Sequence, residues 1–296
     1  DTSNILQVNS YSFDERYYQH TIEQEDGNTV VKFYPSVTFI ISCCWNKGEA
    51  FTKWIGQVGT LNATTIMEEA GAVGSCIHEA VENLIDGETV VSDDIDGSFK
   101  PYLSQKVKYG IKSFLKFCED YEPRFESTEF ITYCEEFGYA GTVDILCWIR
   151  ADKFMTKTAV NTYEKEEIKK ISEEFDIDPR TCYIEVDYKW VKCIIDVKSS
   201  KDVHEEHKMQ LASYLYSETD GTLTDCRAAI LHIGNSTKIG YSFLPLKESG
   251  EDGNSVDDWF RRFKVCCVQV FKERFPNAKP KTDVFPKEFK LTKENN

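Results

Sequence analysis

Residues 194–198 read Ile-Ile-Asp-Val-Lys, and this short run constrains the fold more than any other part of the chain. Its two isoleucines and its valine are typical of a buried strand, in which successive side chains point to opposite faces. Asp196 and Lys198 therefore leave the strand on the same face and lie side by side. An acid and a base at the end of a buried strand predict a polar site at the edge of a sheet.

A second apolar segment also carries one acid. Residues 138–149, GYAGTVDILCWI, hold Asp144 in their interior, where an unpaired carboxylate is costly. Two strands with one acid each suggest a shared divalent cation, because Mg²⁺ prefers carboxylate oxygen ligands. Water and a substrate phosphate oxygen would complete such a site, and Lys198 is placed to stabilise charge that develops on phosphorus. The pattern therefore predicts phosphodiester hydrolysis.

Four motifs in a fixed order extend this interpretation. They are His78 in GSCIHEAVENL, Asp144 in GTVD, Asp196 and Lys198 in DVK, and Gln210 and Tyr214 in QLASY. Together they resemble the PD-(D/E)XK nuclease superfamily, in particular its RecB-like branch. Further upstream, PSVTFII and FTKWIGQVG are similar to a segment of the mitochondrial genome maintenance exonucleases and related phage enzymes. The resemblance covers roughly residues 34–216.

The resemblance implies a role for each motif residue. The implied metal ligands are His78, Asp144, Asp196 and the backbone carbonyl of Val197. Lys198 is the implied catalytic lysine, and Gln210 and Tyr214 lie one helical turn apart, on a face that can brace it and hold substrate. Because imidazole is a softer ligand than carboxylate, the site should accept Mn²⁺ as readily as Mg²⁺. Glu129, upstream of GTVD, is expected to support the site.

Each of these residues also has a purely structural interpretation. His78 lies among apolar helix positions, where a histidine is often a core residue with its hydrogen bonds satisfied. The two aspartates can form a buried salt bridge with Lys198 and have no further function. Gln210 and Tyr214 are equally suited to core packing or helix capping. The order of the motifs favours the functional interpretation for the histidine, the aspartates and the lysine.

The expected function is metal-dependent hydrolysis of DNA by an exonuclease that acts on single-stranded ends or flaps, because the upstream segments resemble enzymes of this kind. Two alternatives stay open. One is a structure-selective or restriction-like endonuclease, and the other is a catalytically silent nucleic-acid-binding module that keeps the fold. The presence of both acids and the lysine argues against the module. The sequence indicates no protein partner.

The charge of the chain limits how it can hold a polyanion. The formal net charge is −15, which argues against nonspecific coating of nucleic acid. Two basic regions remain: residues 99–117 contain five lysines and no acid, and residues 261–296 contain ten Lys/Arg against four Asp/Glu. We expect DNA at the first region, through Lys106, Lys108 and Lys112. His207, one helical turn before Gln210, is expected to approach DNA as well. Each basic run is also compatible with a solvated helix face.

The eleven cysteines include no C-x-x-C pair, and most lie in apolar runs, which predicts buried free thiols and a reducing compartment. Some RecB-like nucleases hold a [4Fe–4S] cluster. We expect none here, because the C-terminal part offers only Cys226 and the adjacent Cys266 and Cys267. No run reaches the roughly 18 apolar residues that span a bilayer, and the first twenty residues do not resemble a signal peptide.

These features predict a cytoplasmic protein or one in another intracellular reducing compartment. A phage-encoded or organellar protein is also compatible with the resemblance. The first residue is Asp rather than Met, so we expect a processed or trimmed N-terminus, and a targeting segment before it would not be visible.

The expected fold is α/β, with a single nuclease domain over residues 1–296. Its core is a central mixed β-sheet flanked by helices, in the restriction-endonuclease-like order αβββαβ. Strands are expected over 127–134, 139–149 and 183–197, with a turn at Gly138. A hairpin is expected over 227–246, turning at Gly234 and Asn235. Helices are expected over 35–59, 66–85, 101–120 and 203–217.

Three further segments complete the prediction. Residues 1–35 form an irregular N-terminal extension, and residues 151–182 form an insertion at a hairpin tip, serving as a solvated helix, a partner surface or a DNA guide. Residues 255–296 contain a closing helix and a basic tail. The residues expected on the inward face of this helix are Trp259, Phe263, Cys266 and Val270. Asp202 and Glu205 have the spacing of a capping box for the helix over 203–217.

Overall fold

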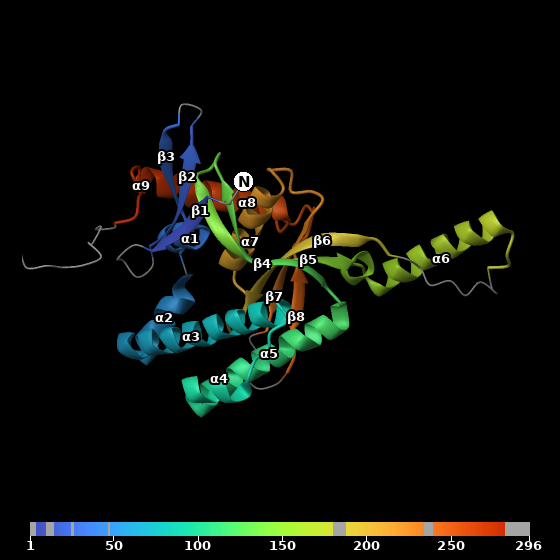
Figure 1. The fold of residues 1–296 in the computed structure, drawn as a ribbon, viewed down its shortest axis with the longest axis horizontal. Coiled ribbons are helices and arrows are strands. Elements are labelled where there is room, and N and C mark those ends of the chain that lie inside the picture. The colour runs from blue at the N-terminus through green and yellow to red at the C-terminus, as the bar shows by residue number, and fades with distance from the viewer. Residues whose placement is uncertain are drawn as a thin grey trace, which may run out of the picture.

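The computed structural model describes residues 4–9, 15–24, 27–46, 48–179, 188–233 and 239–281. A mixed five-stranded sheet with helices on both faces forms its centre, and an antiparallel three-stranded sheet lies beside it (Figure 1). The protein is therefore α/β, and the predicted mixed sheet flanked by helices is confirmed.

The central sheet has the strand order β4-β5-β6-β7-β8. Its strands are β4 (Arg124–Cys134), β5 (Tyr139–Arg150), β6 (Trp190–Lys198), β7 (Arg227–His232) and β8 (Ser242–Pro245). Neighbours are antiparallel except β6 and β7, which run parallel and are connected through the helix α7 (Glu205–Glu218). Parallel neighbours need such a crossover. The turn between β4 and β5 is at Gly138, as predicted, with a φ of +68° that glycine adopts readily.

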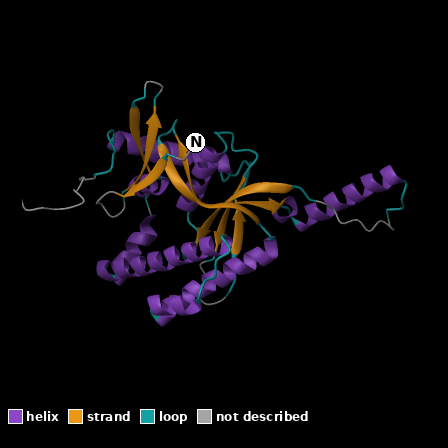
Figure 2. Ribbon diagram, in the orientation of Figure 1, coloured by secondary structure: helices purple, strands orange, loops and turns teal. Residues whose placement is uncertain are grey.

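Helices cover both faces of this sheet (Figure 2), and a hydrophobic core lies on each face. The helices α3 (Thr60–Ile85) and α5 (Pro101–Tyr121) cover one face, into which Ile195 points. The helices α1 (Val37–Cys44), α7 and α8 (Val256–Arg262) cover the other face, into which Ile194 points. Because both faces of β6 are covered, the strand reads as a continuous apolar run instead of an alternating one.

The predicted helices are present in the structure. The predicted helical region 35–59 contains α1 and α2 (Gly48–Val58), and the short α4 (Ser92–Ser98) precedes α5. The helix α3 begins earlier than expected, at Thr60, and ends before Gly87, whose φ is +82°. The helix α5 has Pro101 in its first turn, where proline removes no hydrogen bond that the helix needs.

The prediction of an irregular segment over 1–35 is wrong. Its described residues form the antiparallel strands β1 (Ile5–Asn9), β2 (Arg16–Glu23) and β3 (Thr29–Pro35). Tyr18 and Tyr34 pack against Ala140 of β5, and the hydroxyl of Tyr18 is hydrogen-bonded to that of Thr142 at 2.8 Å. Contacts with a distant strand stabilise this sheet, and such contacts leave no local period in the sequence.

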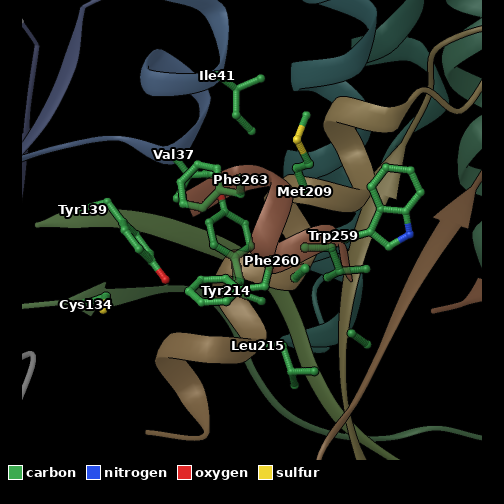
Figure 3. Close-up of a cluster of buried hydrophobic side chains, with 14 of the residues drawn as sticks. Val37, Ile41, Cys134, Tyr139, Met209, Tyr214, Leu215, Trp259, Phe260 and Phe263 are labelled. Carbon is green, nitrogen blue, oxygen red and sulfur yellow. The ribbon is translucent and has the colours of Figure 1, made fainter. Parts of the chain in front are cut away.

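The C-terminal helix shows a shift of its inward face. It consists of α8, the π-helical segment η2 (Phe263–Gln269) and α9 (Val270–Arg274). Trp259 and Phe263 are buried as predicted (Figure 3). The prediction for Cys266 is wrong, because it is exposed and Cys267 is buried in its place. The prediction for Val270 is wrong in the same way, because Val270 is only partly buried and Phe271 is buried in its place. A π-helical turn inserts one residue, which moves the inward face by one position.

The predicted insertion lies at the tip of the hairpin that β5 and β6 form. It contains the 3₁₀ turn η1 (Ala151–Phe154) and the helix α6 (Lys157–Phe175), which extends away from the sheet (Figure 1). The strand predicted from 183 begins at Trp190 in the described part. Four predicted features lie outside the described residues: Cys182, strand residues 183–187, the hairpin turn at Gly234 and Asn235, and the basic tail from 282 onward.

None of the helices in the described part combines the length and the apolar character needed to cross a lipid bilayer. All ten cysteines that the structure describes are free thiols.

Candidate active site

The strands β5 and β6 bring the two aspartates of the sequence motifs to one place. Ile145 of β5 pairs with Ile195 of β6, and the strands are antiparallel. Asp144 and Asp196 are therefore the next residues of the two neighbouring strands beyond this pair. The backbone N–H of Val197 donates a hydrogen bond of 2.6 Å to Asp144 Oδ2. The strand pairing therefore fixes the orientation of the Asp144 carboxylate.

Asp196 and Lys198 lie on the same side of β6 and form an ion pair. The Lys198 ammonium lies 2.9 Å from Asp196 Oδ1 and 2.7 Å from Asp196 Oδ2. The Asp196 side chain is 1% exposed, so its charge depends on this lysine. The ammonium also donates a hydrogen bond of 3.3 Å to Gln210 Oε1.

Two further residues, His78 and Glu129, lie close to Asp144. The helix α3 supplies His78, whose Nδ1 lies 3.6 Å from Asp144 Oδ1 and 3.7 Å from Oε1 of Glu129 in β4. Glu129 has a φ of +44°, a left-handed backbone conformation that is strained for a residue with a side chain. Strain of this kind persists where surrounding contacts enforce it, and it often accompanies functional sites.

The helix α7 supports Lys198 through two side chains. Gln210 Nε2 donates a hydrogen bond of 3.0 Å to the Tyr214 hydroxyl, while its carbonyl oxygen accepts one from Lys198. Tyr214 is buried against β5, and a Cβ atom at Gly141 would lie only 2.3 Å from the tyrosine ring. The glycine of the GTVD motif thus lets the ring approach the strand.

The position of His78 depends on the packing of α3 against α5. A Cβ atom at Gly110 of α5 would lie 2.6 Å from Ile77 Cδ1, so this glycine allows the two helices to approach closely. Ile77 is buried in the core beneath the sheet, and His78 follows it in the chain. The imidazole is therefore held at the sheet edge by a well-packed helix.

Burial and mutual attraction shift the pKa values of these groups. Burial opposes the charged form of His78, but the carboxylates of Asp144 and Glu129 outweigh it and raise the pKa of His78 to about 10. Burial also opposes ionisation of Asp144, yet His78 and Lys198 hold its pKa below the usual value. Burial raises the pKa of Asp196 to about 6, against the attraction of Lys198. The site therefore places opposite charges in contact at neutral pH.

Apart from the buried Asp196, these groups line one cavity of about 690 Å³, which we call the acidic cavity. Its carboxylates are Glu79, Glu82, Glu129 and Asp144, and its other side chains include His78, Lys198, Gln210, Tyr214 and Arg16. Glu79 and Glu82 are on α3 next to His78, and Arg16 begins β2. The cavity thus collects side chains from both sheets and from the helices α1, α3 and α7.

The donor atoms suit a hard divalent cation. One atom each from His78, Glu129 and Asp144 lies within 4.8 Å of the others, and no other such group of three occurs among the described residues. Two carboxylate oxygens and an imidazole are ligands that Mg²⁺ and Mn²⁺ accept. Asp196 lies beside this group without joining it. Its Oδ2 receives no hydrogen bond from the described residues, although the Lys198 ammonium is near.

The predicted metal ligands are thus brought together in part. His78 and Asp144 are in contact. The third member of their donor group is Glu129, which the sequence suggested only as a supporting residue. Asp196 pairs with Lys198, and the contact that Val197 makes is through its N–H. Arg16 was not predicted, because it lies in the segment that the sequence indicated to be irregular.

The three lysines predicted to bind DNA do not share one face of α5. Lys106 lies over the ring of Tyr102 and lines a second cavity, described below. The Lys108 ammonium lies 2.6 Å from Asp96 Oδ2 of α4. Lys112 is exposed and lies outside both cavities. A continuous track of three lysines is therefore not present in the structure.

The start of α7, which includes His207, differs from the prediction. The N-cap is His204 and not Asp202, and its N–H donates a hydrogen bond of 3.2 Å to His207 Nδ1. Burial, with repulsion from Lys198, lowers the pKa of His207 to about 3, so the ring is neutral. Since Nδ1 accepts, the proton of the neutral ring is on Nε2, which makes that atom a hydrogen-bond donor.

No known protein-family model matches this chain, and no curated protein matches it either.

Proposed function

We propose that this protein is a metal-dependent nuclease that hydrolyses phosphodiester bonds of DNA, with single-stranded ends or flaps as its substrate. One observation carries the proposal: the three-residue donor group borders the same cavity as Lys198, which is paired with the buried Asp196. Phosphoryl transfer requires charge stabilisation around the phosphate, and carboxylates with a buried lysine suit this requirement. The free thiols of the described part support a reducing compartment for the protein.

The residues divide the chemistry between them. His78, Glu129 and Asp144 would hold the cation. Bound Mg²⁺ or Mn²⁺ would supply a Lewis acid for the phosphate and lower the pKa of a water molecule. Lys198, oriented by Asp196 and Gln210, would stabilise the negative charge that grows on the phosphate oxygens. Tyr214 would hold Gln210 in place from the buried side.

A pair of substrates tests the proposal. The protein is incubated with labelled linear single-stranded DNA and with a closed single-stranded circle, in Mg²⁺, in Mn²⁺ and in EDTA. We expect loss of the linear strand alone, with either cation and not in EDTA. Loss of both substrates would identify an endonuclease. Loss of neither, together with retained binding, would overturn the nuclease proposal in favour of a binding module.

A further inference from the structure

A second cavity opens on the other side of His78 and Lys198. It has a volume of about 570 Å³ and shares Gly74, His78 and Lys198 with the acidic cavity. Cavities of about 300–1,000 Å³ are typical of small-ligand sites. We call it the basic cavity, because Lys106, Lys198, Lys201 and His207 line it, and no Asp or Glu is among the described residues that do so.

The cations of the basic cavity are available to a ligand. Lys100, which precedes α5, and Lys108 and Lys116 within it form ion pairs. Within the described part of the chain, Lys106 and Lys201 make no ion pair, and both are exposed. A chain with net charge −15 that leaves two neighbouring lysines unpaired beside a buried third one offers a local site for an anion.

One wall of the basic cavity is apolar and nearly free of long side chains. Gly71 and Gly74 lie on the face of α3 that borders it, with Val73 and Ile77 beside them and Ile233 opposite. A Cβ atom at Gly74 would lie 3.1 Å from Ser199 Oγ, whereas one at Gly71 would meet nothing within 4 Å. The helix backbone thus leaves open space beside Gly71, in a cavity that the lysines also line.

A phosphate beside a flat apolar group is the chemistry of a nucleotide. Lys106 and Lys201 would take the phosphate, and the neutral ring of His207 offers a donor at Nε2. The base would lie in the open space beside Gly71, against the apolar groups of the wall, since apolar contact is non-directional and does not depend on base identity. The acidic cavity offers no such site, because four carboxylates line it.

We propose that the basic cavity is a subsite for one nucleoside monophosphate unit, either the nucleotide adjoining the bond that is cut or the mononucleotide released. This inference rests on the proposed nuclease function for its place in a reaction, but the binding itself does not require catalysis. Because Lys198 and His78 border both cavities, a strand that occupies the basic cavity has its next phosphate at the candidate metal ligands.

Calorimetric titration of the protein in EDTA tests the subsite without hydrolysis. The probes are thymidine 5′-monophosphate, thymidine and inorganic phosphate. We expect the monophosphate to bind at least tenfold more tightly than either part alone. The double substitution Lys106→Gln with Lys201→Gln should weaken its binding at least tenfold. Lys112→Gln, on the same helix but outside the cavity, should change it less than twofold.

A second pair of variants controls for folding. Gly71→Glu and Gly71→Gln both extend into the open space and match in size, but only the first adds a negative charge. We expect Gly71→Glu to weaken binding of the monophosphate at least fivefold relative to Gly71→Gln. Equal binding by these two variants, equal loss in Lys112→Gln, or no binding of the monophosphate by the unmodified protein would each overturn the subsite.

The two proposals fail separately. Cleavage of linear DNA in Mn²⁺ without binding of thymidine 5′-monophosphate would overturn the subsite and leave the nuclease. Binding of the monophosphate with the expected pattern of variants, but without cleavage in either cation, would support the subsite and overturn the nuclease.

Discussion

Gly141→Ala tests whether the approach of Tyr214 to β5 holds the site together. The added Cβ would lie 2.3 Å from Tyr214 Cε1, 2.9 Å from Cζ and 3.0 Å from the hydroxyl oxygen. The ring is 3% exposed and is packed in the core around α7 (Figure 3), so it has little room to move away. Overpacking of this kind costs about 1–3 kcal/mol. The hydrogen bond that Gln210 donates to Tyr214, and the one that Lys198 donates to Gln210, would shift with the ring.

Urea unfolding followed by circular dichroism measures this cost. We expect the free energy of unfolding of Gly141→Ala to fall by about 1–3 kcal/mol. Gly71→Ala serves as a control, because its added methyl group meets open space in a helix and should stabilise the protein by up to about 1 kcal/mol. Tyr214→Leu removes the clashing ring atoms, so the double-mutant cycle should show a favourable coupling of at least about 1 kcal/mol. Unchanged stability in Gly141→Ala, or zero coupling, would refute the reasoning.

Three further predictions concern the charged groups. Lys198→Ala should keep DNA binding, measured by fluorescence anisotropy, and lower the single-turnover cleavage rate by about 10²–10³; an equal fall in binding would indicate a structural lysine. Burial raises the pKa of Asp196 to about 6, so ionisation of this group lowers the free energy of unfolding of the wild type by up to about 3 kcal/mol as pH rises from about 4 to 6. Urea unfolding in EDTA should show that Asp196→Asn lacks this decline. Mn²⁺ at 100 times its Kd should raise the free energy of unfolding by about 2.7 kcal/mol, and His78→Ala at the same Mn²⁺ concentration should show no such gain.

The central sheet and the motif residues could be predicted because they depend on local patterns. A continuous apolar run marks β6 as covered on both faces, and the period of two places Asp196 beside Lys198, which the structure confirms as an ion pair. Helical spacing likewise places Gln210 and Tyr214 on one face of α7, where they are hydrogen-bonded.

The errors arise where distant contacts decide the outcome. Lys108 belongs to the same basic run as Lys106, but the packing of α4 against α5 pairs it with Asp96. A single π-helical turn moved the buried position from Cys266 to Cys267, and composition gives no sign of it. The role of Glu129 beside His78 depends on a left-handed backbone conformation, which is rare for glutamate and has no sequence signature.

Single-turnover cleavage of a labelled linear single strand in Mn²⁺, comparing the wild type with Asp144→Asn, tests the central claim most directly. Asp144 contacts both His78 and the Val197 N–H, and Asn retains its shape while removing the charge that a cation requires. We predict cleavage by the wild type and a rate at least 10³-fold lower for Asp144→Asn. The free energies of unfolding of the two proteins in EDTA should agree within about 2 kcal/mol. Equal cleavage by the two proteins would contradict the assignment of this site.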